Sequence, residues 1–179
     1  MAQASEAPTD RTSTADQDVL NQWAGVEADS MVAQLRAERP DVAGAAQRSY
    51  QALLESDAPG GVSRPEREMV ALRVAVLTPC PPLVAWHQDR LRRLGVSDAA
   101  IIAVERFPSG DQPPARERAV LEYVDRLTRT PDMATAAHLA ELKTAGLTPR
   151  DIVTIAQLVA LLSFEVRVLA GLRLLGAAR

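Results

Sequence analysis

One stretch of the sequence decides the fold and also holds the candidate site: Glu68-Met-Val-Ala-Leu-Arg-Val-Ala-Val-Leu-Thr-Pro-Cys80-Pro-Pro-Leu83-Val-Ala-Trp-His87. Its first part is apolar around the whole circumference of a helix, which is typical of a central helix rather than a surface one. A Thr-Pro junction interrupts the pattern, and a second helical pattern follows it. The stretch therefore predicts two consecutive helices, over residues 64–77 and 80–94, that pack together as a hairpin.

Three side chains in this stretch can together move protons and attack electrophiles: Glu68, Cys80 and His87. Counted from the Thr-Pro junction, Glu68 and His87 fall at similar heights in the two helices. The sequence therefore predicts that they approach each other across the helix interface, where a carboxylate would orient the imidazole ring as a proton relay needs. The alternative is that the two side chains point to different faces and that each pairs with an arginine. We take Glu68, Cys80 and His87 as the candidate catalytic residues.

Leu83 stands one helical turn before His87, where a second cysteine would be well placed for activation by the histidine. Cys80 and His87 are two turns apart, roughly 10 Å along the axis at about 1.5 Å per residue, so a direct thiol–imidazole hydrogen bond is not expected. Cys80 lies near a helix N-terminus, which favours a thiolate, but the prolines on both sides of it remove backbone donors. The sequence predicts modest activation of the thiol at most, and a small buried hydrophobe is the simpler interpretation.

Simpler structural roles also fit the other candidates. Glu68 lies in the first part of its helix, where the helix dipole favours an acidic side chain, or it could pair with Arg64. His87 taken alone fits a core or surface histidine. Arg167 interrupts an apolar face near the C-terminus and, if buried, needs a carboxylate or several carbonyl groups, with Glu68 and Glu165 as the candidate carboxylates.

Composition bounds the function classes. The chain has 179 residues, of which 47% are hydrophobic, enough for one domain with a proper core. Its formal net charge of −3 and its dispersed basic residues predict no binding to nucleic acid. One cysteine excludes an intrachain disulfide, and one cysteine with two histidines argues against a structural metal site. The usual phosphate-loop, dinucleotide, zinc-protease and serine-hydrolase motifs are absent from the sequence, so we predict no cofactor and no metal.

The ends and the apolar segments indicate where the protein works. The N-terminus lacks the basic and apolar regions of a signal peptide, and the single cysteine suits a reducing compartment, so we expect a cytoplasmic protein. The apolar stretch 152–164 is interrupted by three polar residues and is too short to span a bilayer, so we expect no membrane association. The all-round apolar character of 64–77 and 152–166 instead indicates self-association.

Capping signals predict the helix boundaries. Ser63-Arg-Pro-Glu66 forms a capping box, Thr148-Pro-Arg-Asp151 repeats the design, and Gly95 and Gly146 mark helix ends. The predicted helices span residues 17–25, 29–38, 41–56, 64–77, 80–94, 98–105, 114–129, 135–145 and 149–175, with a loop at 107–114.

The domain organisation follows from this helix pattern. Strand signals are absent, so the predicted fold class is all-α. Residues 1–16 have no apolar period and are expected to form a disordered tail. Residues 17–179 are expected to form a single helical domain, with N-terminal helices over 17–59 and a core over 60–176.

The spacing of Glu68, Cys80 and His87 resembles the alkylhydroperoxidase D-like / carboxymuconolactone decarboxylase (CMD) family. Its redox members have a glutamate followed by Cys-x-x-Cys-x-x-x-His, and Leu83 falls on the second cysteine. The C-terminal half is similar too, in the segments Glu117-Arg-Ala-Val-Leu-Glu-Tyr-Val and Leu147-Thr-Pro-Arg-Asp-Ile-Val and in Phe164 and Arg167 before Gly171. The resemblance covers roughly 60–176, and residues 17–59 resemble the extra N-terminal helices of a CMD-domain subgroup. It implies an alkylhydroperoxidase D-like helical bundle that forms a homo-oligomer, as a dimer, trimer or hexamer.

The resemblance also implies a set of functions. In the redox members the second cysteine attacks the peroxide, the first resolves the disulfide, and the glutamate and histidine relay protons. Decarboxylase members without the cysteine pair use the same fold for non-redox chemistry on an acidic lactone. Since Leu83 replaces the attacking cysteine, the resemblance implies little two-cysteine peroxidase activity in this chain.

Three hypotheses follow, and whether the chain is an enzyme stays open among them. The first is acid/base chemistry on a small molecule by Glu68 and His87, with Cys80 nearby. The second is a single-cysteine peroxidase or antioxidant protein that uses Cys80 and an external thiol. The third is a non-catalytic oligomeric scaffold. A pocket that reaches Glu68 and His87 would favour the enzymes, and a site filled by Leu83 and Trp86 would favour the scaffold.

Overall fold

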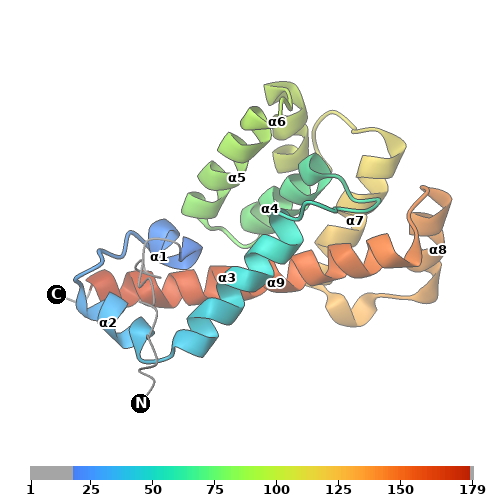
Figure 1. Ribbon diagram of the computed structural model, residues 1–179. Coiled ribbons are helices and arrows are strands. Elements are labelled where there is room, and N and C mark those ends of the chain that lie inside the picture. The colour runs from blue at the N-terminus through green and yellow to red at the C-terminus, as the bar shows by residue number, and fades with distance from the viewer. Residues whose placement is uncertain (1–17, 178–179) are drawn as a thin grey trace, which may run out of the picture.

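The computed structural model describes residues 18–177 and is helical throughout that range, with no strand among these residues (Figure 1). The α-helices are α1 (Val19–Ala24), α2 (Met31–Ala37), α3 (Pro40–Leu54), α4 (Arg64–Leu77), α5 (Pro81–Arg93), α6 (Asp98–Arg106), α7 (Ala115–Arg129), α8 (Ala136–Thr144) and α9 (Pro149–Ala177). This confirms the predicted all-α class, and each predicted helix is present with ends within two residues. A short 3-10 helix, η1 (Pro131–Met133), was not predicted. The predicted tail, residues 1–16, lies outside the described residues.

Helix α4 is the centre of the bundle, as its all-round apolar pattern predicts. It packs against α5, α7 and α9 and also contacts α6 and α3 (Figure 1). Its apolar side chains with no exposed surface are Val70, Ala71, Leu72, Val74 and Ala75. The sequence analysis missed Arg73, which is buried in the same helix. Its Nε donates to Asp125 Oδ1 at 2.6 Å, and its guanidinium lies 5.5 Å from the centre of the Phe107 ring.

The beginnings of α4 and α9 are both capped and lie side by side. The Ser63 side chain and Glu66 form the predicted capping box at the start of α4. At the start of α9, Asp151 Oδ2 accepts from the Thr148 backbone N–H at 2.9 Å and from its hydroxyl at 2.7 Å. A Cβ atom at Gly61 would lie 2.6 Å from Asp151 Oδ1, so only glycine fits at this approach.

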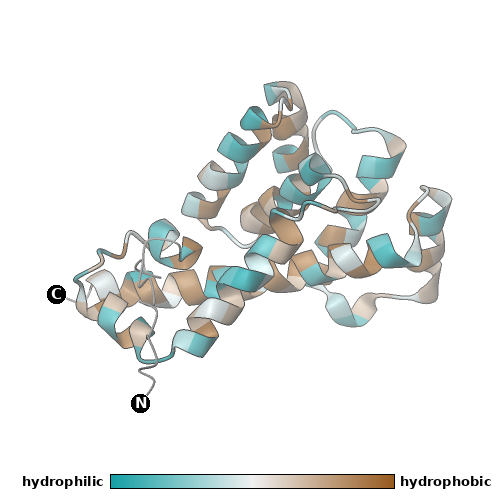
Figure 2. Cartoon of the chain, in the orientation of Figure 1, coloured by the Kyte–Doolittle hydropathy of each residue, from teal (hydrophilic) through white to brown (hydrophobic). Residues whose placement is uncertain are grey.

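Helix α9 runs along the whole bundle and buries one regular stripe. The buried residues of that stripe recur every three or four positions: Ile155, Leu158, Leu162, Glu165, Leu169 and Leu172. Hydrophobic residues recur along the helix in Figure 2. The helix is longer than the apolar stretch 152–164. By length and composition alone it could cross a membrane, because its most apolar 18 residues have a mean hydropathy of 1.9. Of these 18 residues, 44% are buried inside the protein. A long core helix meets the same criterion, and the buried stripe is typical of one.

The N-terminal helices cover part of the surface of α9 that α4 leaves free. Helices α1, α2 and α3 each contact α9, and α1 also contacts α5 (Figure 1). Trp23 on α1 and Tyr50 on α3 have buried side chains that belong to the main hydrophobic core. The N-terminal helices therefore build part of the core around the α4–α5 hairpin.

Candidate functional site

The α4–α5 hairpin brings the predicted acid/base pair together. His87 Nδ1 lies 2.7 Å from Glu68 Oε2, and the two side chains are 0% and 1% exposed. The predicted approach of these residues across the helix interface is confirmed. A separation this short places the Nδ1 proton in a hydrogen bond to the carboxylate, which orients the imidazole ring.

The second oxygen of Glu68 binds an arginine. Arg90, one turn after His87 on α5, donates from Nε to Glu68 Oε1 at 2.6 Å. Arg90 in turn forms an ion pair with Glu55 at the end of α3, with 3.2 Å between Nη1 and Oε1. The sequence analysis treated pairing of Glu68 with His87 and pairing with an arginine as alternatives. In the structure this carboxylate does both at once. Arg64 pairs with Asp57 at 3.0 Å, so its predicted pairing with Glu68 is wrong.

The other nitrogen of His87 is free. Nε2 is buried and has no hydrogen-bond partner among the described residues. Because Nδ1 is engaged by Glu68, this nitrogen is the one available to accept or deliver a proton. An oriented imidazole with one free nitrogen is the arrangement that general acid/base catalysis needs.

Aromatic side chains surround the histidine, although the chain has only 3% aromatic residues. Both tryptophans and one tyrosine gather here: the Trp23 ring centre lies 6.3 Å from that of His87, 5.8 Å from Trp86 and 5.6 Å from Tyr50. Trp86 Nε1 donates to the Tyr50 hydroxyl at 3.3 Å. Burial raises the pKa of Tyr50 well above its ordinary value, so the hydroxyl stays protonated. The sequence analysis missed Trp23 and Tyr50, because nothing in their local sequence points to residues on α5.

Cys80 immediately precedes α5 and is 6% exposed. Burial raises the pKa of the Cys80 thiol, while the backbone N–H of Leu83 and the positive charge of Arg173 act in the opposite direction. The net direction agrees with the prediction of a weakly activated thiol. Leu83 has no exposed surface and belongs to the main hydrophobic core. At the place of the second cysteine, the chain thus has a packed leucine.

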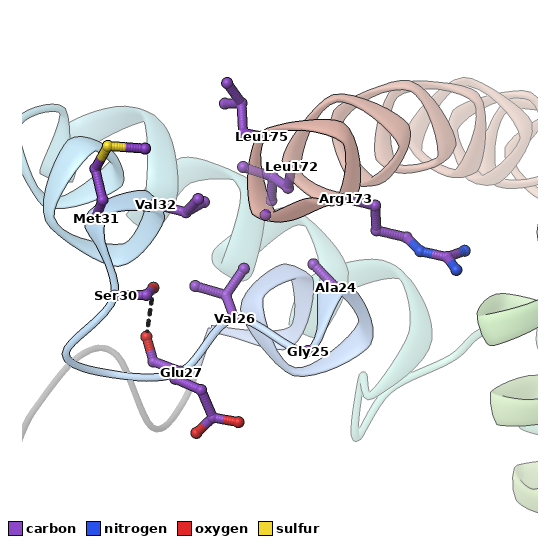
Figure 3. A pocket seen from close by; sticks show the side chains of 11 residues that line it. Ala24, Gly25, Val26, Glu27, Ser30, Met31, Val32, Leu172, Arg173 and Leu175 are labelled. Carbon is purple, nitrogen blue, oxygen red and sulfur yellow. Dashed lines mark hydrogen bonds between the residues drawn. The ribbon is translucent and has the colours of Figure 1, made fainter. Parts of the chain in front are cut away.

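Solvent has almost no access to this cluster in the described conformation, because Glu68, Leu83 and His87 are each at most 1% exposed. A pocket of about 330 Å³ lies elsewhere, between the α1–α2 segment and the C-terminal part of α9 (Figure 3). The candidate catalytic residues do not line it. Among residues 18–177, no group of three His, Cys, Asp or Glu side chains is placed to hold a metal ion.

The expected pairing of Arg167 is wrong. The side chain is exposed and donates to the Ser163 carbonyl, so neither Glu68 nor Glu165 is its partner. Glu165 itself is fully buried, and neither of its carboxyl oxygens has a hydrogen-bond partner within the described part of the chain. Its burial raises the pKa of the carboxyl group to about 8.

Replacement of the shared carboxylate tests the geometry of the pair. We expect Glu68→Gln to lower the free energy of unfolding by about 2–3 kcal/mol, because a buried, partly ionic network loses its central charge. Two-dimensional ¹H–¹⁵N NMR of the imidazole should show a loss of the Nδ1–H form, since an amide is a weaker acceptor. Urea denaturation measures the stability. Glu55→Gln is the matched control, for which a loss below about 1 kcal/mol is expected at a half-exposed ion pair. An unchanged tautomer and stability in Glu68→Gln would contradict this account.

Comparisons with known proteins agree with the fold. A sequence model of the carboxymuconolactone decarboxylase family matches residues 40–126, which contain all the candidate residues. Comparison with curated proteins finds no match. Among solved structures, an uncharacterized peroxidase-related protein with an alkylhydroperoxidase AhpD core from Ralstonia eutropha JMP134 is 26% identical, with a TM-score of 0.68 over 75% of this chain and 70% of the other.

Two further solved structures share the fold at lower identity. A peroxidase-related protein from Silicibacter sp. TM1040 is 23% identical, with a TM-score of 0.66 over 72% of this chain and 66% of the other. A protein of unknown function from Agrobacterium tumefaciens, whose name relates it to the antioxidant defence protein AhpD, is 21% identical, with a TM-score of 0.67 over 75% and 89%. The all-helical AhpD-like bundle is therefore common to these proteins and to the chain described above.

Proposed function

Because this chain belongs to the CMD/AhpD-like family, we propose that it uses Glu68 and His87 as an acid/base pair on a small molecule. We also propose that the chain has little two-cysteine peroxidase activity. The observation that carries it is the state of His87, whose Nδ1 is held by Glu68 while Nε2 is buried and free. A proton relay needs this direct contact between carboxylate and imidazole.

The arrangement around Leu83 supports the loss of the peroxidase cycle. In a two-cysteine mechanism the attacking thiolate must lie beside the proton relay, and the side chain one turn before His87 is apolar and packed. The remaining thiol, Cys80, has a raised pKa and therefore less thiolate at neutral pH. The site retains parts that can move protons and lacks the nucleophile.

A single-cysteine peroxidase is the second candidate. It is favoured by the position of Cys80 directly before α5, where the Leu83 backbone N–H and the positive charge of Arg173 act to lower the pKa of the thiol, although burial outweighs them. In this candidate an external thiol resolves the oxidised Cys80. Peroxide turnover that disappears in Cys80→Ser would support it against the acid/base pair.

A non-catalytic oligomeric scaffold is the third candidate. It is favoured by the closed site, in which Leu83 is packed beside His87 and Trp23 and Trp86 lie next to each other near the imidazole. For an enzyme, some movement of the surrounding helices must admit the substrate.

An activity measurement separates these candidates. We propose incubating the protein with a carboxymuconolactone and, in parallel, with a small organic hydroperoxide and a dithiol. The expected result is loss of carbon dioxide from the lactone at a rate that falls by about 10²-fold or more in His87→Asn, because the proton-transfer group is removed. The Cys80→Ser protein should retain this activity. Lactone turnover that is unchanged in His87→Asn, or no lactone turnover at all, would contradict the acid/base proposal for this substrate class.

A further inference from the structure

A cleft with a volume of about 580 Å³ lies between the end of α3, the beginning of α4 and the beginning of α9. Its charged lining residues are Arg67 and Arg150, and none of the described residues that line it is acidic. We call it the arginine cleft. The residues of the site around Glu68 and His87 do not line it, so its binding properties can be tested apart from the proposed acid/base chemistry.

Arg67 is fixed in the wall of the cleft by the backbone. Its side chain is 4% exposed, its Nε donates to the Val62 carbonyl at 2.9 Å, and its two Nη atoms donate to the carbonyls of Leu53 and Pro59. A guanidinium group has five N–H donors, and these bonds use three of them. Two N–H groups of a buried, rigidly held cation therefore have no partner among the described residues.

Arg150 brings a second guanidinium to the same place. A Cβ atom at Gly60 would lie 3.9 Å from the Cζ atom of Arg150, and Pro59, whose carbonyl Arg67 binds, directly precedes this glycine. Burial lowers the pKa of Arg67, and the positive charge of Arg150 acts in the same direction. The two cations thus lie at one turn of the chain, close enough to repel each other.

The carboxylates of the surrounding segments do not neutralise this pair. Each of them already has another partner: Glu55 pairs with Arg90, Asp57 pairs with Arg64, and Asp151 accepts hydrogen bonds from Thr148. The charge of Asp151 raises the pKa of Arg67, but burial and Arg150 outweigh it. Within residues 18–177, neither Arg67 nor Arg150 forms an ion pair with a carboxylate. Two adjacent, uncompensated guanidinium groups in a cleft favour an anion from solution.

We propose that the arginine cleft binds the phosphate group of a small phosphate monoester. Such a group carries a charge of about −1.5 to −2 at neutral pH, which matches two guanidinium groups, whereas a single carboxylate would leave one of them uncompensated. The planar donor pairs of arginine also fit phosphate oxygens two at a time. Leu53 and Val153 line the cleft beside the arginines and offer an apolar contact to the organic part of the ester.

Titration calorimetry with inorganic phosphate and with glycerol 2-phosphate, at constant ionic strength, tests the cleft. Arg150 is exposed, so Arg150→Gln should fold normally, and its affinity for both probes should fall at least about tenfold because half of the positive charge is lost. Arg129→Gln is the matched control, since it removes an exposed arginine from the end of α7, away from the cleft, and it should bind as wild type does. No saturable binding to wild type, or equal weakening in both variants, would overturn the proposal.

Two further measurements test the chemistry of the ligand. Arg150→Lys keeps the charge but loses the planar donors, so its affinity for phosphate should lie between those of wild type and Arg150→Gln. Phosphate should also raise the unfolding temperature of wild type more than that of Arg150→Gln, because a ligand of the folded state stabilises it. Succinate, a dicarboxylate of similar charge, should bind more weakly than glycerol 2-phosphate. Tighter binding of succinate would overturn the assignment to phosphate in favour of a dicarboxylate.

Discussion

Leu83→Cys is expected to give this protein hydroperoxide reductase activity that the wild-type chain has only at a low level. The new thiol would lie one turn before His87, whose Nε2 is free and whose ring Glu68 already orients. An imidazole there can take the thiol proton, and the thiolate can attack the peroxide oxygen with release of an alcohol. Cys80, three residues earlier, can then condense with the resulting sulfenic acid, releasing water and forming a disulfide that the dithiol reduces.

The measurement is the turnover of a small organic hydroperoxide with a dithiol reductant, for which we expect at least a tenfold gain over wild type. Leu83→Ser is the matched control, because it removes the same packing without adding a thiol and should show no gain. Leu83→Cys combined with Cys80→Ser should lose repeated turnover, since the resolving thiol is gone. Replacing a fully buried leucine should reduce stability by about 1–3 kcal/mol, so folding is checked by thermal denaturation. A folded Leu83→Cys protein without peroxide turnover, or a wild-type protein that is equally active, would refute the interpretation of Leu83.

The second large effect concerns Glu165, which is buried in the middle of the α9 core stripe without a hydrogen-bond partner among the described residues. Burial raises the pKa of this carboxyl group to about 8 in the folded protein, against an ordinary value near 4.5. The folded state therefore holds the proton over a pH range in which the unfolded chain has released it. Stability from this group is fully present below about pH 4.5 and is lost as the pH rises to about 8, at up to about 1.4 kcal/mol for each pH unit.

We expect Glu165→Met to remove this pH dependence. The variant should unfold at a higher temperature than wild type near pH 8, and the difference between the two should shrink steadily as the pH is lowered toward 5. Glu165→Gln is the control that abolishes titration while keeping a buried polar group, so it should lack the pH dependence without the full gain in stability. Thermal denaturation at a series of pH values measures both. If the unfolding temperatures of Glu165→Met and wild type differ by a constant amount from pH 5 to pH 8, Glu165 is ionised in the folded protein and this account is wrong.

The helices of this protein and the core of its candidate site follow from local sequence. Caps such as Ser63 with Glu66, and the apolar periods between them, depend on residues within one or two turns, so the boundaries could be predicted within two residues. The contact of Glu68 with His87 was also predictable, because two consecutive helices with a tight junction must pack antiparallel.

The surroundings of that pair depended on contacts between distant segments. Trp23 and Tyr50 reach the site from α1 and α3, and no local pattern records which face of α5 those helices cover. The exposure of Arg167 and the isolation of Glu165 likewise follow from the rotation of α9 about its axis. That rotation is set by the packing of α4, α7 and the N-terminal helices against it. The sequence determined the helices and the catalytic-type pair, and the tertiary structure decided which side chains enclose the pair and which face of α9 stays exposed, because burial is a property of the whole packed bundle.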